Sequence, residues 1–232
     1  MVAIKWQPPL PARPTSFRAM EPPATPTPLT ITREQINELE LARFTHTAHV
    51  VTTPQAVDLA VRELMAEPVL GFDTESRPSF RKGESFPPSL IQLASSQAVY
   101  LFQLGRIGGF EGLVPLLEAG HILKAGVALH DDIRRLWQIH PFEPGGFVEI
   151  SDLTRELGVE KTGLRSLAGL FLGVRISKGA QLSNWARPHL TQRQVAYAAA
   201  DAWFSLQLYQ RVKAIADGRA SPLALREPPL AD

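Results

Sequence analysis

The feature that most limits the possible folds of this chain is the alternation of strand-like and helix-like segments over residues 49–216. Apolar runs typical of buried strands occupy residues 49–51, 68–75, 89–95, 98–104, 121–129 and 146–150. Helix-like segments occupy residues 54–66, 110–120, 131–139, 152–157, 164–173 and 191–216. The third and fourth runs are separated by a short turn near Ser95 and Gln97, which predicts a hairpin, whereas intervening helices favour parallel pairing. The pattern predicts a three-layer α/β domain with a mixed central sheet.

Proline marks both ends of the chain. Residues 1–30 contain eight of the twenty prolines and show neither a helical nor a strand period. We therefore expect residues 1–45 to form a disordered tail, residues 46–217 to form the folded domain, and residues 218–232 to form a second tail. A natural start at Met20 instead of Met1 stays open.

Composition excludes some classes of site. The chain has no cysteine, which rules out disulfides and thiolate zinc sites, so a bound metal would be a hard cation such as Mg²⁺ or Mn²⁺. The net charge of +1 means that a polyanion would need a local basic patch. No apolar run reaches the roughly 18 residues of a membrane helix, and the N-terminus lacks the apolar segment of a secretory signal. These features favour a soluble cytoplasmic protein.

Carboxylates follow two of the strand-like runs. Asp73 and Glu75 end the run VLGFDTES, and their spacing places both side chains on one face of the strand. They lie at its carboxyl end, where open α/β sheets bind ligands. Asp131 and Asp132 lie at a strand-to-helix junction, where one aspartate can cap the helix while the other faces a ligand. Each pair alone is also compatible with ordinary surface charge.

A third acidic position lies in the last helix. Tyr197 and Asp201 are four residues apart and share a helix face, and the alanines between them would let this helix approach another element closely. Convergent carboxylates repel one another, and a pair of divalent cations would relieve that repulsion. An unperturbed phenol has a pKa near ~10, so Tyr197 suits the orientation of a water molecule better than proton abstraction.

The segments GFDTE, AGVALHDDIRRL and YAAAD, in this order, resemble the three motifs of the DEDD superfamily of 3′–5′ exonucleases. The tyrosine at position 197 is similar to the one that distinguishes the tyrosine (DEDDy) branch of this superfamily. The similarity to RNase D and to the Werner syndrome helicase exonuclease domain covers about residues 46–213 and includes SFRKG, SLIQLA, GLRSLAGLFLGV and SNW. It implies an RNase H-like (DnaQ-like) fold. It also implies metal-dependent release of nucleoside 5′-monophosphates from the 3′ end of RNA or DNA.

The resemblance also implies roles for individual residues. The implied ligands of two Mg²⁺ or Mn²⁺ ions are Asp73, Glu75, Asp132 and Asp201, and the implied water-positioning residue is Tyr197. Asp132 is the match because the family aspartate precedes a leucine, here Leu136, by four residues. Ser76 departs from the family pattern, since many relatives carry a large residue there. The alternative left open is a catalytically silent nucleic-acid-binding module on the same fold.

Basic residues indicate where a nucleic acid would lie. Residues 161–193 contain six Lys or Arg residues and no Asp or Glu, and the loop after the first motif adds Arg77, Arg81 and Lys82. We expect the substrate-binding residues to be Thr74, Arg81, Lys178, Ser183, Asn184 and Trp185. The ring of Trp185 could stack on a base or pack in the core, and packing is favoured. The choice between RNA and DNA and the oligomeric state stay open.

Overall fold

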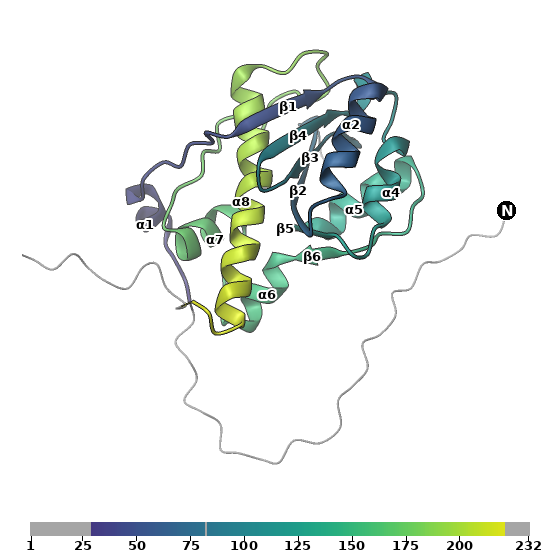
Figure 1. Cartoon of the computed structure of the whole chain (residues 1–232). Coiled ribbons are helices and arrows are strands. Elements are labelled where there is room, and N and C mark those ends of the chain that lie inside the picture. The colour runs from purple at the N-terminus through teal and green to yellow at the C-terminus, as the bar shows by residue number, and fades with distance from the viewer. Residues whose placement is uncertain (1–28, 82, 221–232) are drawn as a thin grey trace, which may run out of the picture.

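The computed structural model describes residues 29–81 and 83–220 (Figure 1). The strands are β1 (Thr47–Val51), β2 (Val69–Ser76), β3 (Pro88–Ala94), β4 (Ala98–Gln103), β5 (Leu123–Gly126) and β6 (Phe147–Glu149). The α-helices are α1 (Arg33–Glu38), α2 (Pro54–Leu64), α3 (Leu104–Ile107), α4 (Val114–Glu118), α5 (Leu129–Ile139), α6 (Ile150–Glu156), α7 (Leu164–Leu167) and α8 (Gln192–Ala216). A 3₁₀ turn, η1 (Glu111–Leu113), precedes α4, and a π-helical turn, η2 (Ala168–Leu172), follows α7.

The six strands form one mixed sheet in the order β1-β4-β3-β2-β5-β6. β3 pairs antiparallel with β2 and with β4, whereas the β1–β4, β2–β5 and β5–β6 pairs are parallel. The expected hairpin joins β3 to β4, and its turn is closed by the Ser95 hydroxyl, which accepts hydrogen bonds from the backbone N–H groups of Gln97 and Ala98. The prediction of a mixed sheet is confirmed.

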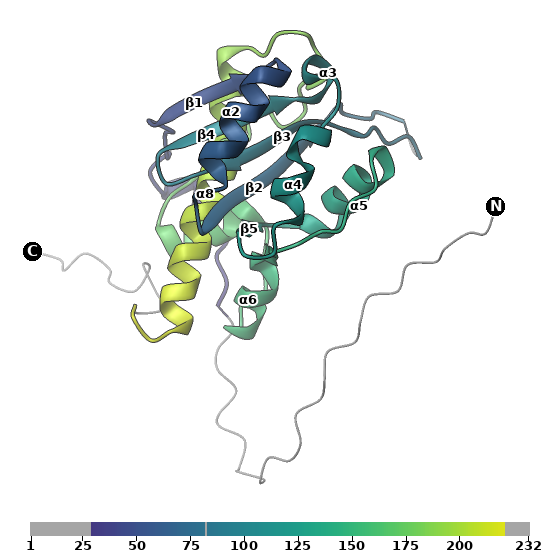
Figure 2. The same cartoon turned by 45° about the vertical axis from the view of Figure 1, so that its right-hand side comes forward.

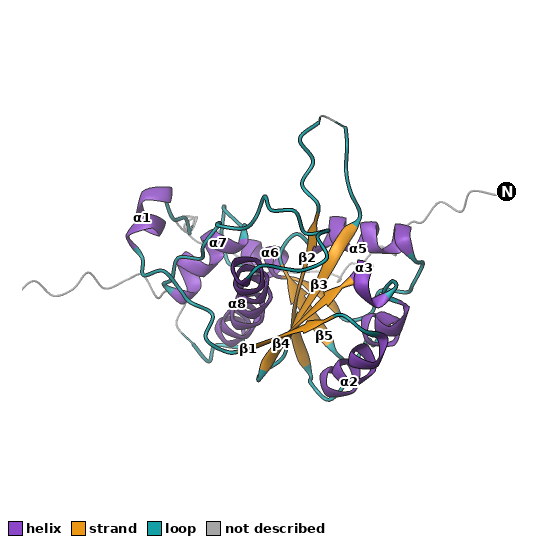
Figure 3. Ribbon diagram, turned by 90° about the horizontal axis from the view of Figure 1, so that it is seen from above, coloured by secondary structure: helices purple, strands orange, loops and turns teal. Residues whose placement is uncertain are grey.

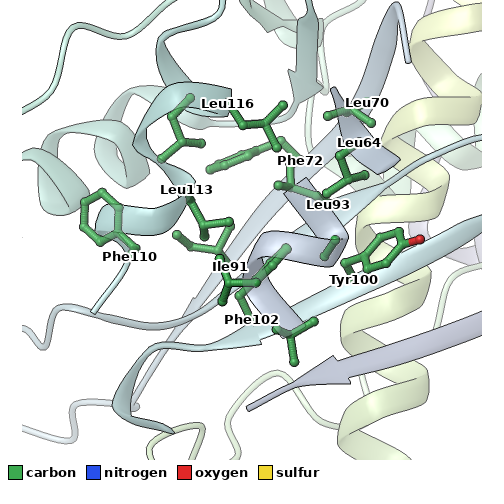
Figure 4. Packing of buried hydrophobic residues seen from close by; sticks show 14 of the residues in the cluster. Leu64, Leu70, Phe72, Ile91, Leu93, Tyr100, Phe102, Phe110, Leu113 and Leu116 are labelled. Carbon is green, nitrogen blue, oxygen red and sulfur yellow. The ribbon is translucent and has the colours of Figure 1, made fainter. Parts of the chain in front are cut away.

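Helices cover both faces of the sheet, which confirms the three layers (Figure 3). Helix α8 lies along one face, and α2, α4 and α5 lie on the other (Figure 2). The core between α2 and the sheet contains Leu64 of α2, Phe72 of β2 and Phe102 of β4, all fully buried (Figure 4). Complete burial of such a side chain contributes about 1.5–3 kcal/mol. None of the helices within the described residues is both long and apolar enough to cross a membrane.

Helix α8 packs directly on β2. It begins with the expected capping box, in which Thr191 and Gln194 satisfy each other's backbone N–H groups, and it ends at Ala216 as expected. Ala198, Ala199 and Ala202 are fully buried in the contact with the sheet. The expectation that small residues let this helix approach another element is therefore confirmed.

The folded part of the chain begins earlier than expected. Residues 29–44, which we assigned to a disordered tail, pack against the domain, and Ile31 is only 1% exposed. A capping box between Thr32 and Gln35 starts α1, and the Leu29 N–H donates to the Gly158 carbonyl at 3.0 Å. The expected boundary at residue 46 is wrong because these apolar residues find partners far along the chain, which a local pattern does not reveal. Residues 1–28 and most of the expected C-terminal tail lie outside the described residues.

Two expected helices differ in detail. The segment 110–120 is divided into η1 and α4, and Pro115 lies in the first turn of α4, where its missing N–H costs nothing. The segment 164–173 begins as α7 and continues as the π-helical turn η2. Both segments bury apolar side chains: Leu113, Leu116 and Leu117 belong to the core on the α2 side of the sheet, and Leu167, Leu170 and Phe171 pack with residues of α1 and α8.

Candidate active site

Strand β2 and helix α8 bring three carboxylates together. Asp73 and Glu75 project from the same face of β2, and Asp201 projects from the facing side of α8. One oxygen from each side chain lies within 4.8 Å of the others, a spacing that can hold a metal ion. The close contact depends on Gly71, because a Cβ there would lie 2.0 Å from the Ala202 carbonyl oxygen of α8. The sequence therefore places the acids on two elements that small residues press together.

Asp132 reaches the same pocket from α5. Its Oδ1 accepts a hydrogen bond from the Thr74 hydroxyl at 2.8 Å, so the residue between the two β2 acids orients the aspartate of the second motif. Asp131, in contrast, is about 60% exposed and forms an ion pair with Arg134. The structure thus separates two adjacent aspartates into one that faces the pocket and one that faces solvent. Asp132 lines the pocket without belonging to the compact group of three.

The start of α5 is not capped by either aspartate, contrary to one reading of the sequence. The Glu149 carboxylate, at the end of β6, accepts hydrogen bonds from the backbone N–H groups of Ala128 and Leu129 at 3.1 and 2.8 Å. Ala128 has φ 63°, a left-handed conformation that is costly for a residue other than glycine. Because Glu149 satisfies these N–H groups, Asp132 is free to face the pocket. No motif in the sequence singles out Glu149.

The strand that carries the acids is irregular where they end. A register shift in the β2–β3 ladder falls between Glu75 and Ser76. Such bulges bend a strand and change the direction of a side chain, and they are common beside active sites. Ser76, the position that departs from the family pattern, therefore lies at this bend.

Burial dominates the electrostatics of the carboxylates. It raises the pKa of Asp73 well above 3.8, and repulsion from the other three acids adds to the shift. Burial also raises the pKa of Glu75 to about 9, with further repulsion from Asp201 and Asp132. It raises the pKa of Asp201 to about 7, against a hydrogen bond from Tyr197 that lowers it, and the pKa of Asp132 to about 6. The four raised pKa values mean that the pocket disfavours the ionised carboxylates. A bound cation would stabilise this ionised form.

Tyr197 lies beside the three-carboxylate group. Its hydroxyl donates a hydrogen bond to Asp201, one turn along α8. Burial, followed by the charges of Asp201 and Glu75, raises the pKa of the phenol above its ordinary value of 10.0. The hydroxyl therefore keeps its proton at neutral pH and can donate and accept hydrogen bonds, but it does not serve as a base.

The acids open into a pocket of about 500 Å³. Its other walls come from residues 127–128 between β5 and α5, from residues 163–166 and from residues 176–178. Arg165, Lys178 and Gln181 add positive or polar side chains to the lining of this pocket. Arg165 and Gln181 were not among the expected substrate-binding residues, although Arg165 belongs to the basic block that the sequence shows.

The expected substrate-binding residues fall into two groups. Thr74 and Lys178 line the pocket. Arg81 lies outside it, exposed in the loop that extends beyond β2 and β3 (Figure 3). Lys82, next to Arg81, lies outside the described residues.

Residues 183–185 support α8 and do not line the pocket. The Ser183 hydroxyl and the Asn184 carbonyl both accept hydrogen bonds from the Gln194 side chain at 3.1 Å. Trp185 is 1% exposed and packs beside Tyr197, with ring centroids 5.9 Å apart. Trp185 therefore packs in the core, the alternative that the sequence favours, and its prediction as a substrate-binding residue is wrong because a buried ring has no free face for a base.

Residues 48–216 match the sequence family described as 3′–5′ exonuclease. The chain belongs to this exonuclease family. It is 34% identical over 155 residues to the bifunctional 3′–5′ exonuclease/ATP-dependent helicase WRN of Mus musculus, which covers 64% of this chain and 11% of that protein. It is 33% identical over 142 residues to ribonuclease D of Haemophilus influenzae, which covers 60% of this chain and 35% of that protein.

A solved structure supports the fold assignment of the exonuclease domain. The crystal structure of Trypanosoma brucei RNase D in complex with RNA U12 superimposes with a TM-score of 0.66 at 19% identity, covering 72% of this chain and 63% of that chain. The fold is therefore RNase H-like, as the resemblance implied. The two curated relatives are much longer proteins, and this chain spans between about a tenth and a third of their length.

Proposed function

We propose that this chain is a metal-dependent 3′–5′ exonuclease that removes nucleoside 5′-monophosphates from the 3′ end of a nucleic acid. The observation that carries the proposal is the group formed by Asp73, Glu75 and Asp201, whose oxygens lie within 4.8 Å of one another. Asp132 and Tyr197 line the same pocket, so all the residues implied by the family motifs converge.

The donor set fits hard divalent cations. All the candidate ligands are carboxylate oxygens, and their raised pKa values reflect a site that favours added positive charge. We propose that Asp73, Glu75 and Asp201 hold Mg²⁺ or Mn²⁺, and that Asp132 contributes from the side of Thr74. When bound, two such cations would lower the pKa of a water molecule and would stabilise negative charge on the oxygens of the scissile phosphate.

The chain's own groups would bind and orient the reactants. The Tyr197 hydroxyl, held by Asp201, would align a water molecule with the phosphorus atom. Lys178 and Arg165 would contact phosphate oxygens on the opposite wall. Water then adds across the bond between phosphorus and the 3′ oxygen of the preceding nucleotide. The products are a nucleoside 5′-monophosphate and a strand with a new 3′ hydroxyl.

The substrate is proposed to be single-stranded RNA or DNA. The RNA-bound structure of T. brucei RNase D supports RNA as one candidate. Discrimination between the two depends on contacts to the 2′ hydroxyl. Parallel assays on RNA and DNA strands of matched sequence decide between them. A cytoplasmic location stays a prediction of the sequence, and fractionation of cells that express the chain tests it.

The central experiment measures degradation of a 5′-labelled single strand in Mg²⁺ or Mn²⁺. We expect a ladder that shortens from the 3′ end and disappears with a chelator. Asp132→Ala should abolish most of the activity, whereas the matched variant Asp131→Ala should retain it, because Asp131 points to solvent and pairs with Arg134. Asp73→Ala should also be inactive while its circular dichroism spectrum stays that of the wild type. Equal activity of Asp73→Ala and the wild type would disprove the proposal.

The same assay tests the alternative of a silent binding module. That alternative predicts retention of a labelled strand without shortening in either cation. The presence of all four carboxylates in one pocket favours the enzyme, since a binding module gains nothing from repelling the phosphates of its ligand.

A further inference from the structure

A second pocket adjoins the acidic one and has the opposite charge. It has a volume of about 330 Å³, within the range of small-ligand sites. Its walls come from residues 42–44, from the segment 176–180 and from one face of α8. Ile176, Ser177 and Tyr197 line both pockets, so the two pockets are direct neighbours.

Two arginines give this second pocket its charge. Arg43 and Arg193 line it, and among the described residues no aspartate or glutamate does. Within residues 29–81 and 83–220, neither guanidinium takes part in an ion pair. Both side chains are exposed. Their charges are therefore available to an external anion.

The local packing holds one arginine over the pocket. The Arg193 guanidinium lies against the backbone of Gly179, where an added Cβ would stand 2.7 Å from its Nη. Small residues of α8, Ala196 and Ala200, follow Arg193 on the same helix face and leave space below it. Phe44 also lines the pocket, and its ring packs edge-to-face with Trp203, with the two ring centroids 6.1 Å apart. The pocket thus combines two cations with a flat apolar surface, the combination that suits a phosphodiester and its attached base.

We propose that this second pocket, the Arg43–Arg193 pocket, binds the part of the strand that lies on the 5′ side of the scissile phosphate. The inference rests on the proposed exonuclease function, since it assumes that the 3′-terminal nucleotide occupies the acidic pocket. A strand leaving that pocket past Ile176 and Tyr197 exchanges repulsive carboxylates for two guanidinium groups. Residues 42–44 belong to the segment that packs on the domain ahead of β1, so this segment takes part in substrate binding.

The first test measures binding without cleavage. In an Asp73→Ala background, fluorescence anisotropy of a 5′-labelled single strand gives the dissociation constant over a range of salt concentrations. The slope of log K against log salt is negative, and each lost phosphate contact on a single strand makes it less steep by about 0.7. We expect this decrease, with several-fold weaker binding, for Arg43→Ala and for Arg193→Ala. The control Arg62→Ala removes an exposed arginine of α2 on the other side of the sheet and should leave the slope unchanged.

The second test separates this inference from the exonuclease proposal itself. The p-nitrophenyl ester of thymidine 5′-monophosphate contains the scissile phosphate and no nucleotide on its 5′ side. Arg43→Ala and Arg193→Ala should hydrolyse this ester at the wild-type rate while their KM for a strand rises several-fold. If the wild type hydrolyses neither substrate, the exonuclease proposal fails. The anisotropy measurements then test by themselves whether the Arg43–Arg193 pocket binds a strand.

Either of two results would overturn the inference. If Arg43→Ala and Arg193→Ala bind the strand with wild-type affinity and slope while Arg81→Ala reduces both, the strand leaves over the β2–β3 loop instead. A several-fold loss of ester hydrolysis in the two pocket variants would also contradict it, because the effect would then lie in the acidic pocket.

Discussion

Tyr197 stands where the acidic pocket and the Arg43–Arg193 pocket meet, and its chemistry follows from that position. Burial and the neighbouring carboxylates raise the pKa of the phenol, so its hydroxyl stays protonated at neutral pH. It can then donate to Asp201 and accept from a water molecule at the same time. The residue acts by orientation and does not transfer a proton.

Replacement of Tyr197 by phenylalanine tests this role. Tyr197→Phe removes the hydroxyl and keeps the ring that packs beside Trp185. We expect kcat to fall by about 10²-fold because the attacking water is no longer well oriented, with little change in strand affinity measured by anisotropy. Tyr209→Phe, a buried tyrosine further along the same helix, is the matched control and should retain full kcat. A loss confined to affinity would contradict a water-orienting role.

The raised carboxylate pKa values make stability depend on pH. The pKa of Glu75 rises from 4.5 to about 9 and that of Asp201 from 3.8 to about 7 on folding, so the folded chain binds more protons than the unfolded chain between these values. Without cations, the free energy of unfolding should therefore be greatest at about pH 4 and should fall as the pH rises to about 9. Thermal unfolding in a chelator across this range measures the effect, and a flat profile would contradict it.

Neutralising one carboxylate should stabilise the cation-free protein and weaken its response to cations. We expect Asp201→Asn to raise Tm in a chelator at pH 8, since it removes a buried charge next to Asp73. Mg²⁺ or Mn²⁺ should raise the Tm of the wild type by preferential binding to the folded state. The rise should be much smaller for Asp201→Asn and unchanged for Asp131→Asn, whose side chain lies in solvent.

At the scale of elements, the contact between β2 and α8 sets the geometry of the site. β2 carries Asp73 and Glu75, α8 carries Tyr197 and Asp201, and the two elements touch through glycine and alanine. The run of small residues that separates Tyr197 from Asp201 is therefore part of the site's construction. Any increase in the distance between the two elements should separate the metal ligands.

Gly71→Ala tests this contact. The new Cβ would lie 2.0 Å from the Ala202 oxygen and 2.8 Å from the Leu206 nitrogen, both backbone atoms that cannot rotate away. We expect a loss of about 1–3 kcal/mol in the free energy of unfolding, together with weaker cation binding by the folded protein. The matched variant Gly105→Ala places its Cβ in open space and should be neutral or slightly stabilising. Denaturant titration and calorimetry with Mn²⁺ measure the two effects.

At the scale of the whole molecule, the segment ahead of β1 completes the domain. Ile31 and Ile36 are buried beside Leu208 and Val212 of α8, on the same face of the sheet as the acids. The Ala42 N–H donates to the Arg175 carbonyl at 2.9 Å. This bond joins the segment to the loop in which Ile176 and Ser177 line both pockets. The segment therefore supports the site as well as the core.

Truncation of Ile31 tests how far the fold depends on this segment. Ile31→Ala should cost about 2–5 kcal/mol in the free energy of unfolding, because the side chain is fully enclosed. Ile139→Ala removes the same atoms from a position that is 43% exposed and should cost much less. Equal effects of the two variants in urea titrations would show that residues 29–44 do not belong to the cooperative unit.

The sequence by itself predicted the six strands, the mixed sheet and the described helices other than α1 and α3, and its three motifs identified the five candidate site residues. These features are local, since strand and helix periods, caps and short motifs depend on neighbours within a few residues. The small residues around Tyr197 and Asp201 also predicted a close helix contact, although they did not identify β2 as the partner.

Only the tertiary structure decided the features that depend on distant partners. It showed that Glu149 caps α5, that Trp185 is buried, and that residues 29–44 pack on the domain. It also placed Arg43 beside Arg193, which are far apart in the chain. The physical reason is that the burial of a side chain and its distance from other charged groups depend on which distant segments of the chain pack together. A residue's own neighbours in sequence do not determine that.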